Sequence, residues 1–376
     1  MSVFFELRDA PIFCNVLLPT REEALAAPRS EIRLASCPAC GLIYNTSFDP
    51  SALSYNGTYE NSLHFSARFR QYARELAGHL VNRHQLYGKD VIEIGCGQGE
   101  FLSLLAGFGH NRCLGFDPSY DPAKLAFAPD AAVTIMTDVY REAYADRPAD
   151  LICCRHVLEH IPDPLVFLRS VRHAVGERYR TVVFFEVPNG LFLLENLFVW
   201  DIIYEHCSYF TPSSLSDLFM RAGFSPIDVS MQFGSQYLTI EAMPLAGAPP
   251  LAPDATARVL EAAGVTKFAD AYLRKLAFWR GKLGTGRTQT VLWGAGAKGV
   301  SFLNALDLPH EAIRYAVDVN PRKHGKFIPG TGQQVVHPEA LRELKPELVI
   351  VTNPIYQAEI RDTLNSLQLQ PEISIA

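Results

Sequence analysis

What the sequence lacks excludes several classes of protein. Acidic residues outnumber basic ones by 40 to 34, the net charge is −6 and no basic run occurs, which argues against binding of nucleic acid. No apolar run reaches the roughly 18 residues of a transmembrane helix, so we expect no membrane partner. The N-terminal residues Met1 to Glu6 lack the basic and apolar regions of a secretory signal. We therefore expect a cytoplasmic protein whose eight cysteines do not form a disulfide framework.

Length and composition indicate two or three folded domains. A chain of 376 residues with 48% hydrophobic and 20% charged residues can bury large cores and is not disordered. The stretch from Pro244 to Pro253 is rich in proline and alanine and is the best candidate for a linker. We predict a small cysteine-bearing domain over residues 1–70, a central domain over 71–243 and a C-terminal domain over 254–376.

Strand and helix patterns alternate in both of the larger parts. Helices are expected near Phe69 to Val81, from Leu165 to Val175 and, after the linker, from Ala255 to Leu283. The expected strands are Val91 to Ile94, Leu114 to Asp117, Leu151 to Cys154, Thr181 to Val187, Val291 to Trp293, Tyr315 to Val317 and Leu348 to Val351. This alternation predicts an α/β protein with two parallel sheets flanked by helices.

A glycine-rich loop follows the first strand of the central part. Gly95, Gly97 and Gly99 stand between a strand and a helix, and Glu93 precedes them. Glycines at these positions allow a tight turn and a close approach of the backbone to a ligand. Asp117 lies about 20 residues further on, at the end of the next strand, where an acid can bind ribose hydroxyls. The spacing G-x-G-x-G differs from the G-x-G-x-x-G of dinucleotide folds.

Two histidine-bearing stretches follow. His156, Glu159 and His160 are spaced so that they would share one face of a helical turn, and such a face can hold a metal. A third ligand is not evident nearby, so we do not predict a metal here; His156 could contact the cofactor and His160 is the better catalytic candidate. In the second stretch Glu205 precedes His206, whose imidazole can take up a proton near neutral pH. A surface ion pair is the alternative for these two residues.

The C-terminal part has a glycine loop of its own. Gly294, Gly296 and Gly299 have the G-x-G-x-x-G spacing, and Asp318 ends the next strand. Taken alone, this pattern would indicate NAD(P) and an oxidoreductase, but it is a weak signal without further support.

Three stretches together resemble one family. They are the loop E-I-G-C-G-Q-G at Glu93, the stretch L-E-H-I-P at Leu158 and the stretch Y-E-H-C-S-Y-F at Tyr204. The first resembles the S-adenosylmethionine motif of class I methyltransferases, and all three resemble the nucleotide-sugar C-methyltransferases. The resemblance runs along nearly the whole chain. It implies a Rossmann-like class I core, a second Rossmann-like C-terminal domain and a small N-terminal zinc domain.

The resemblance also implies roles for individual residues. The substrate would be a nucleoside-diphosphate sugar with a keto group, methylated on carbon through an enolate. His206 would be the base, supported by Glu205, and His160 would polarise the keto oxygen as an oxyanion donor does. Tyr204 is the other catalytic candidate. Candidates for the cofactor S-adenosylmethionine are Glu93, Gly95, Gly97, Gly99, Asp117, Asp138 and His156, and candidates for the substrate are Tyr59, Asn189, Gly294, Gly296 and Lys298.

Two departures from the family's pattern concern the substrate and the metal. The family often has a tyrosine where this chain has Ile203, so stabilisation of the enolate and the substrate itself could differ. The N-terminal part has one C-x-x-C pair, Cys37 and Cys40, and a separate Cys14. Three thiolates would need a fourth ligand such as His64 to hold Zn²⁺, and a turn that has lost its metal is the alternative.

Other functions stay open at this point. An O- or N-methyltransferase would use the same cofactor with another metabolite, and His206 would then deprotonate a hydroxyl group. A nucleotide-binding protein with a vestigial methyltransferase domain is a third reading, against which the intact set around Gly95 argues. The sequence does not determine the oligomeric state.

Overall fold

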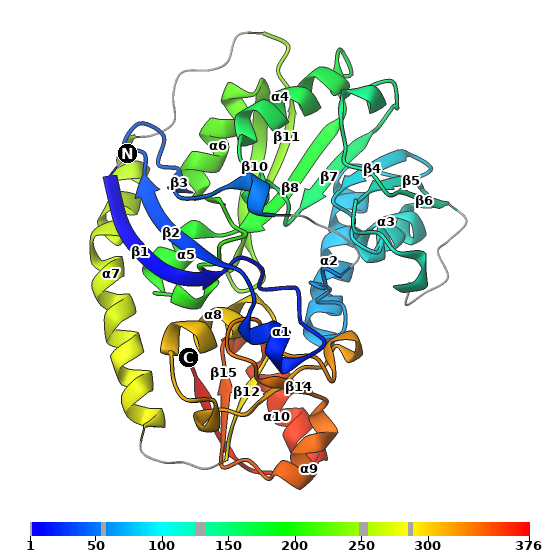
Figure 1. Ribbon diagram of the computed structural model, residues 1–376. Coiled ribbons are helices and arrows are strands. Elements are labelled where there is room, and N and C mark those ends of the chain that lie inside the picture. The colour runs from blue at the N-terminus through cyan, green and yellow to red at the C-terminus, as the bar shows by residue number, and fades with distance from the viewer. Residues whose placement is uncertain (1, 54–57, 125–131, 248–254, 285–288) are drawn as a thin grey trace.

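The computed structural model describes residues 2–53, 58–124, 132–247, 255–284 and 289–376, which form three sheets and a long helix (Figure 1). Most of the expected linker, residues 248–253, lies outside the described residues. The α/β class is confirmed, and the sheet of the central part is flanked by helices as expected.

The central sheet has the order β10-β11-β8-β7-β4-β5-β6, and its neighbouring strands are parallel except where β11 pairs with β10 and β8. Its strands are β4 (Asp90–Ile94), β5 (Arg112–Phe116), β6 (Val133–Met136), β7 (Leu151–Arg155), β8 (Val182–Pro188), β10 (Phe224–Gln232) and β11 (Tyr237–Pro244). The chain proceeds from β4 to β5 and β6 on one side and then to β7 on the other. Ligands bind beside such a switch in strand order, at the carboxyl ends of the strands.

Alternate residues of the central strands face two different helix layers. Ile92, Ile152 and Phe185 pack with α4 (Pro164–Val175) and α6 (Pro212–Arg221), whereas Val91, Leu151 and Phe184 pack with α2 (Ala67–Arg83) and α3 (Glu100–Gly109). Both faces are buried, which explains why these strands are nearly continuous apolar runs.

The C-terminal sheet is parallel throughout, with the order β14-β13-β12-β15-β16. Its strands are β12 (Thr290–Trp293), β13 (Tyr315–Val317), β14 (Gln334–Val336), β15 (Leu348–Val351) and β16 (Glu372–Ile375), and its helices are α8 (Ala297–Leu306), α9 (Leu341–Leu344) and α10 (Gln357–Ser366). The three strands expected here are confirmed. The switch in strand order lies between β12 and β15, so the Gly294 loop occupies the ligand-binding position of this fold.

The N-terminal part is an antiparallel sheet that the sequence analysis did not identify. Strands β1 (Ser2–Pro11), β2 (Arg29–Ser36) and β3 (Ile43–Asn45) are joined by α1 (Arg21–Leu25) and a turn. The fourth strand, β9 (Ser208–Tyr209), comes from the central part of the chain and pairs with β3. The N-terminal sheet is therefore tied to the segment that carries His206.

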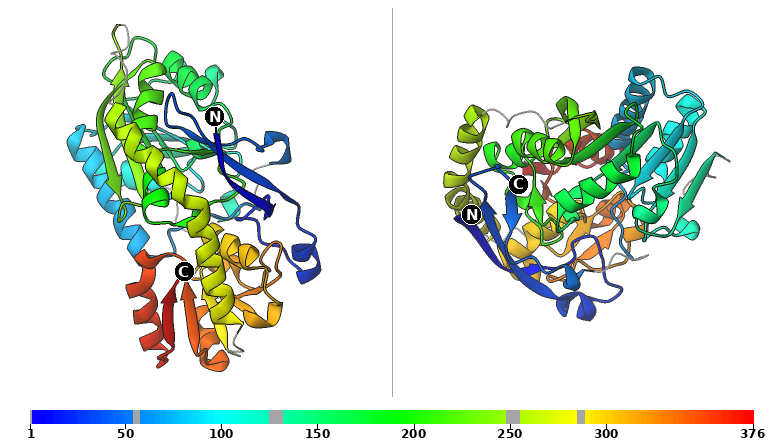
Figure 2. Two further views of the ribbon diagram at one scale, coloured as in Figure 1. Left: turned by 90° about the vertical axis from the view of Figure 1, so that its left-hand side faces the viewer. Right: turned by 90° about the horizontal axis from the view of Figure 1, so that it is seen from above.

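One helix and one core join the three parts. Helix α7 (Ala255–Leu283), confirmed at its expected position, runs along one side of the molecule from β1 to the C-terminal domain (Figures 1 and 2). Phe268 of α7 packs against Phe5 of β1, and Trp200, which follows α5 (Gly190–Glu195), packs against Phe302 of α8. Among the described residues, no helix is long and apolar enough to cross a membrane.

Candidate active site

The loop after β4 has the backbone conformation that its glycines permit. Gly95, Gly97 and Gly99 all have positive φ, at 69°, 56° and 82°. A Cβ at Gly95 would lie 2.1 Å from a methyl of Val157, and one at Gly99 would lie 2.6 Å from a methyl of Ile135. A Cβ at Gly97 would meet no atom within 4 Å. Neighbouring side chains thus pack against the loop at Gly95 and Gly99. At Gly97 the loop is open, so a ligand can approach the backbone there.

Two carboxylates flank this loop. Asp117 accepts a hydrogen bond from the backbone N–H of Gly97 at 2.8 Å and two from Ser119. Glu93 is 2% exposed, and burial raises the pKa of its carboxyl group to about 8. Its Oε2 atom has no hydrogen-bond partner among the described residues. A buried, unpartnered carboxylate beside an open loop fits a cationic ligand such as the α-amino or sulfonium group of S-adenosylmethionine.

Asp138 lies after β6 and is engaged by its own neighbourhood. Its carboxylate accepts hydrogen bonds from Arg141, from the Tyr144 hydroxyl at 2.6 Å and from the backbone N–H of Val139 at 2.8 Å. These bonds lower the pKa of Asp138. They fix the conformation of the loop after β6, and a contact between Asp138 and the adenine stays a prediction.

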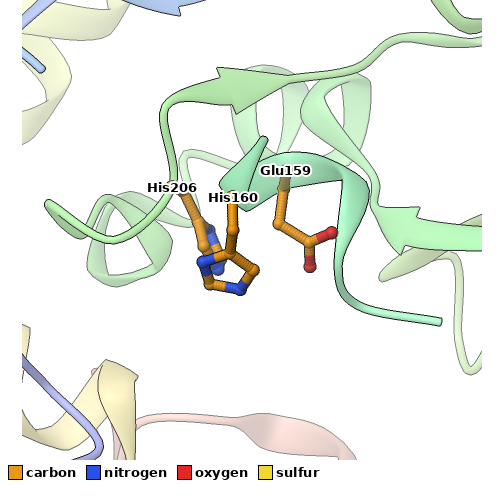
Figure 3. Close-up of side chains that lie close together, drawn as sticks. All are labelled: Glu159, His160 and His206. Carbon is orange, nitrogen blue, oxygen red and sulfur yellow. The ribbon is translucent and has the colours of Figure 1, made fainter. Parts of the chain in front are cut away.

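Two distant segments bring His160 and His206 together. Glu159 and His160 lie in a single 3-10 turn, Leu158–His160, while His206 precedes β9. The backbone N–H of Cys207 donates to the carbonyl of Glu159 at 2.9 Å, and His160 Nδ1 donates to the carbonyl of Glu205 at 2.8 Å. The two imidazole centroids are therefore 4.9 Å apart, and Figure 3 shows Glu159 beside them.

Burial keeps both imidazoles neutral. It lowers the pKa of His160, and it lowers the pKa of His206 well below its usual range. The positive charges of Lys298 and His156 add to the effect on His206, and the two adjacent imidazoles disfavour being charged together. His206 Nδ1 is buried and has no hydrogen-bond partner among the described residues. A carbonyl oxygen only accepts, so the proton of neutral His160 is on Nδ1 and its lone pair is on Nε2. Neutral His160 can therefore accept from Nε2 but cannot donate from it, contrary to the oxyanion-donor role that we expected.

The expectation that His156 shares a face with Glu159 and His160 is wrong. His156 has φ of 54°, which ends the regular spacing before the 3-10 turn begins. Its Nε2 lies 2.9 Å from Glu186 and its Nδ1 lies 3.7 Å from Glu159. Although burial opposes it, these two carboxylates raise the pKa of His156 to about 9, so that it is positively charged. Contact with the cofactor stays a prediction for this residue.

Sequence reasoning missed the buried charges behind His156. Glu186 of β8 accepts from Arg155 at 2.8 Å and from the hydroxyl of Tyr72, and Arg155 stacks 4.0 Å from the Phe101 ring centroid. Despite complete burial, Arg155 and His156 lower the pKa of Glu186 to about 2. A lone glutamate inside the apolar run of β8 was the available signal, because a buried carboxylate requires partners.

Glu205 contacts the N-terminal part instead of His206. Its Oε2 accepts from the backbone N–H of Cys14 at 2.8 Å, and the Tyr59 hydroxyl also bonds its carboxylate. No hydrogen bond among the described residues joins Glu205 to the imidazole of His206. Direct support of His206 by this carboxylate is therefore a wrong expectation. Burial raises the pKa of Glu205 to about 7. Substrate binding by Tyr59 stays a prediction.

Two further candidates have structural roles. The Tyr204 hydroxyl accepts from the backbone N–H of Asp49 at 2.9 Å, and its ring lies in the core beneath the N-terminal sheet, so direct catalysis by Tyr204 is corrected. Asn189 caps α5 by accepting from Leu191 and donates to the carbonyl of Ser235 at 2.9 Å. Asn189 is 3% exposed and its amide makes these two bonds, and binding of substrate by Asn189 stays a prediction.

The C-terminal loop closes on itself and on the central domain. Asp318 accepts from the backbone N–H of Ala295 at 2.8 Å and from Lys323 at 3.3 Å. A Cβ at Gly296 would lie 3.7 Å from Lys323 Nζ, and one at Gly299 would overlap the Gly294 carbonyl oxygen. The negative charge of Asp318 is thus balanced by Lys323 of the same loop. This makes a hydrogen bond between Asp318 and a ribose unfavourable and argues against NAD(P) as the ligand. Binding of substrate by Gly294 and Gly296 stays a prediction.

Lys298 connects this domain to the histidine pair. Its ammonium lies 2.8 Å from Asp201, which belongs to the 3-10 turn Val199–Asp201 of the central domain. Its positive charge is close enough to lower the pKa of His206. A second link is the reciprocal amide pair of Gln236 and Asn353, with both distances at 2.9 Å.

The three cysteines expected to bind zinc do not come together. Cys37 and Cys40 share the turn between β2 and β3, whereas Cys14 is 1% exposed in the core near Glu205. Among the described residues, Glu159, His160 and His206 are the only group of three such side chains whose ligand atoms converge. Cys14, Cys37 and Cys40 thus do not fit one tetrahedral site, and the expected set is corrected.

Known proteins match both the central part and the C-terminal part of this chain. A model named "Methyltransferase domain" matches residues 66–229, and one named "C-methyltransferase C-terminal domain" matches residues 269–370. C-methyltransferase NovU from Streptomyces niveus is 31% identical over 316 residues, which cover 78% of this chain and 73% of NovU. Ubiquinone biosynthesis O-methyltransferase from Erwinia tasmaniensis is 36% identical over 112 residues, covering 28% of this chain and 44% of that protein.

Among solved structures, the 1,6-didemethyltoxoflavin-N1-methyltransferase of Burkholderia thailandensis aligns with a TM-score of 0.37 at 18% identity, covering 48% of this chain and 81% of that one.

The loop after β4 and the matched domain define an S-adenosylmethionine-dependent methyltransferase. More narrowly, the similarity to NovU and the matched C-terminal domain show that the chain belongs to the C-methyltransferase family.

Proposed function

We propose that the protein methylates a carbon atom next to the keto group of a nucleotide-linked deoxysugar. The observation that carries the proposal is the pair of buried, neutral imidazoles at the meeting point of the three domains. The similarity to C-methyltransferase NovU supports methylation of carbon, and the substrate class comes from the family resemblance of the three sequence stretches.

His206 is the base in this proposal. Its imidazole is neutral because burial lowers its pKa, and its Nδ1 has no competing hydrogen bond among the described residues. It takes the proton from the carbon beside the ketone, and the electron pair of that C–H bond moves into the enolate. Base catalysis of this kind contributes about 10²–10⁴-fold in rate. The negative charge that develops on the substrate favours the imidazolium, which offsets the low pKa of His206.

Positive charges near His206 stabilise the enolate. His156 and Lys298 both lower the pKa of His206, which means that both place positive potential at the site. The same potential favours negative charge on the keto oxygen. These two residues thus replace the tyrosine that the family often has at the position of Ile203. His160 contributes its Nε2 lone pair, which can accept a hydrogen bond from protonated His206 or from a sugar hydroxyl.

The cofactor and the nucleotide would be held by the flanking loops. Glu93, Gly97 and Asp117 would hold S-adenosylmethionine, which supplies the electrophilic methyl group. Tyr59 and the Gly294 loop would border the sugar nucleotide, and the contact of Lys298 with Asp201 keeps the C-terminal domain over the site. When bound, S-adenosylmethionine would give its methyl group to the enolate carbon, with the electrons of the S–CH₃ bond remaining on sulfur in S-adenosylhomocysteine.

Proton exchange separates this chemistry from O- or N-methylation. The full chain is incubated in D₂O with dTDP-, GDP- and CDP-linked 4-keto sugars and S-adenosylhomocysteine, and deuterium at the carbon beside the ketone is followed by NMR. Exchange that depends on His206 supports the proposal, with His206→Gln as the inactive variant and His173→Ala as the matched control on the exposed side of α4. In a second reaction with S-adenosylmethionine in place of S-adenosylhomocysteine, a product methylated on oxygen or nitrogen, together with no exchange in the first, would overturn it.

A further inference from the structure

The trio of Glu159, His160 and His206 has features of a metal site that catalysis by His206 does not use. The three ligand atoms lie within 4.8 Å of one another. Glu159 is 1% exposed and His206 is 8% exposed. Glu159 Oε2 and His206 Nδ1 are both buried without a hydrogen-bond partner among the described residues. Leaving two such atoms unsatisfied costs free energy, so a ligand that engages both is favoured.

The chemistry of the three groups selects the class of ligand. Two imidazoles and one carboxylate suit Zn²⁺ and similar borderline cations, while Mg²⁺ and Ca²⁺ prefer oxygen ligands alone. Ligand atoms around tetrahedral zinc stand about 3.4 Å apart, given Zn–N distances of about 2.1 Å, so small side-chain rotations would close the trio. The three side chains project from two adjoining segments toward the same space (Figure 3).

Hydrogen bonds already hold the trio in place. His160 Nδ1 donates to the carbonyl of Glu205, which leaves the Nε2 lone pair as its ligand atom, the arrangement that metal-binding histidines usually have. Glu159 has His156 on the Oε1 side at 3.7 Å, which leaves the unpartnered Oε2 as its ligand atom.

The surrounding charges permit a cation at this position. His156 is positively charged, but it lies 2.9 Å from Glu186. Lys298 likewise lies 2.8 Å from Asp201. Each nearby positive charge is thus paired with a buried or half-buried carboxylate, and Glu159 adds one negative charge to the trio.

We propose that Glu159, His160 and His206 bind a divalent cation of the zinc type, and that the bound cation blocks proton abstraction by His206. Three protein ligands leave a fourth position open. The metal and the catalytic base would use the same imidazole, so binding and methyl transfer exclude each other. The second half of the proposal rests on the proposed role of His206, whereas the binding half does not.

Binding is measured without methyl transfer. The full chain is freed of metal with a chelator, and its affinity for Zn²⁺ is determined by competition with a chromophoric chelator. The variants are Glu159→Gln and His206→Gln, with His173→Ala as control and Cys37→Ser/Cys40→Ser to remove the thiol pair. We expect the wild type, the control and the double cysteine variant to bind zinc at a common site. Loss of a ligand should weaken that site by about 100-fold or more, since changes to the outer shell alone cost about 10–100-fold.

The absorption spectrum of bound Co²⁺ and the melting temperature with Zn²⁺ test the same three ligands independently. Co²⁺ at the site should give tetrahedral d–d absorption without a thiolate charge-transfer band. Zinc should raise the melting temperature of the wild type and of His173→Ala but not that of a folded Glu159→Gln variant, with circular dichroism confirming the fold. Equal zinc affinity in the two ligand variants, or loss of all binding in the double cysteine variant, would refute the site. Zinc binding that leaves methyl transfer unchanged would refute the inhibition and the role of His206, but not the site.

Discussion

The carboxyl group of Glu93 should release a proton when the cofactor binds. Burial raises its pKa to about 8, and the negative charges of Glu100 and Asp117 add to this effect while Arg155 opposes it. Its Oε2 has no hydrogen-bond partner among the described residues. At pH 7 the free protein therefore holds Glu93 about nine-tenths protonated. A cationic ligand beside it favours the carboxylate and lowers its pKa.

The number of protons released and the pH dependence of the affinity follow from the linkage between proton binding and ligand binding. If the pKa of Glu93 falls to about 5 or below in the complex, about 0.9 proton is released at pH 7. The affinity for the ligand should rise with pH, because the ligand prefers the carboxylate form of Glu93 and that form becomes more abundant as the pH rises. Between pH 6 and pH 8 the affinity should rise about 50-fold and then level off.

Titration calorimetry with S-adenosylhomocysteine tests this prediction. Measuring the enthalpy in two buffers with different ionisation enthalpies gives the number of protons released. The α-amino group of the ligand can itself exchange a proton on binding, so the quantity to compare is the affinity of the wild type relative to Glu93→Gln at each pH. A ratio that stays constant from pH 6 to pH 8, with no proton released, would show that Glu93 is ionised in the free protein or does not face the cation.

Three other predictions concern His206 as the base, the positive charge of Lys298 and the glycine loop after β4. His206→Gln should lower the rate of methyl transfer by at least about 10²-fold, with the Kd for S-adenosylhomocysteine within about 2-fold of the wild type; normal turnover would exclude His206 as the base. Lys298→Met removes a positive charge that lowers the pKa of His206, so the acid limb of the pH–rate profile should move to higher pH, and an unmoved limb would contradict the electrostatic argument. Gly95→Ala places a methyl 2.1 Å from Val157, whereas Gly97→Ala meets open space. Both substitutions strain a positive φ by about 1 kcal/mol, and Gly95→Ala should cost about 1–3 kcal/mol more in chemical unfolding; equal losses would mean that the loop relaxes freely.

The sequence predicts the parallel strands of the central and C-terminal sheets well because both faces of these strands are buried. The runs at Val91, Leu151, Thr181, Val291 and Leu348 are apolar at nearly every position, and such runs are strands whatever surrounds them. The N-terminal strands lack this signal. In β1 only Phe5 and the last two residues are buried, so neither alternation nor a continuous run is visible.

The zinc prediction failed because cysteine spacing says nothing about where a lone cysteine goes. Cys37 and Cys40 are kept together because only two residues separate them, but Cys14 is placed by the end of β1 and by the hydrogen bond of its backbone to Glu205. Its thiol fills the core next to α8. The pairing of β9 with β3 ties this region to the segment that carries His206, and no cysteine spacing indicates that link.

The histidine pair shows the limit of periodicity most clearly. Helical spacing grouped His156 with Glu159 and His160, but the left-handed backbone of His156 sends its ring toward Glu186. The third member of the trio comes from His206, which is distant in sequence and is positioned by two hydrogen bonds between its segment and the 3-10 turn. One of these bonds also sets the tautomer of His160. The same contact that assembles the site therefore decides which ring nitrogen carries the proton, and no sequence pattern contains that information.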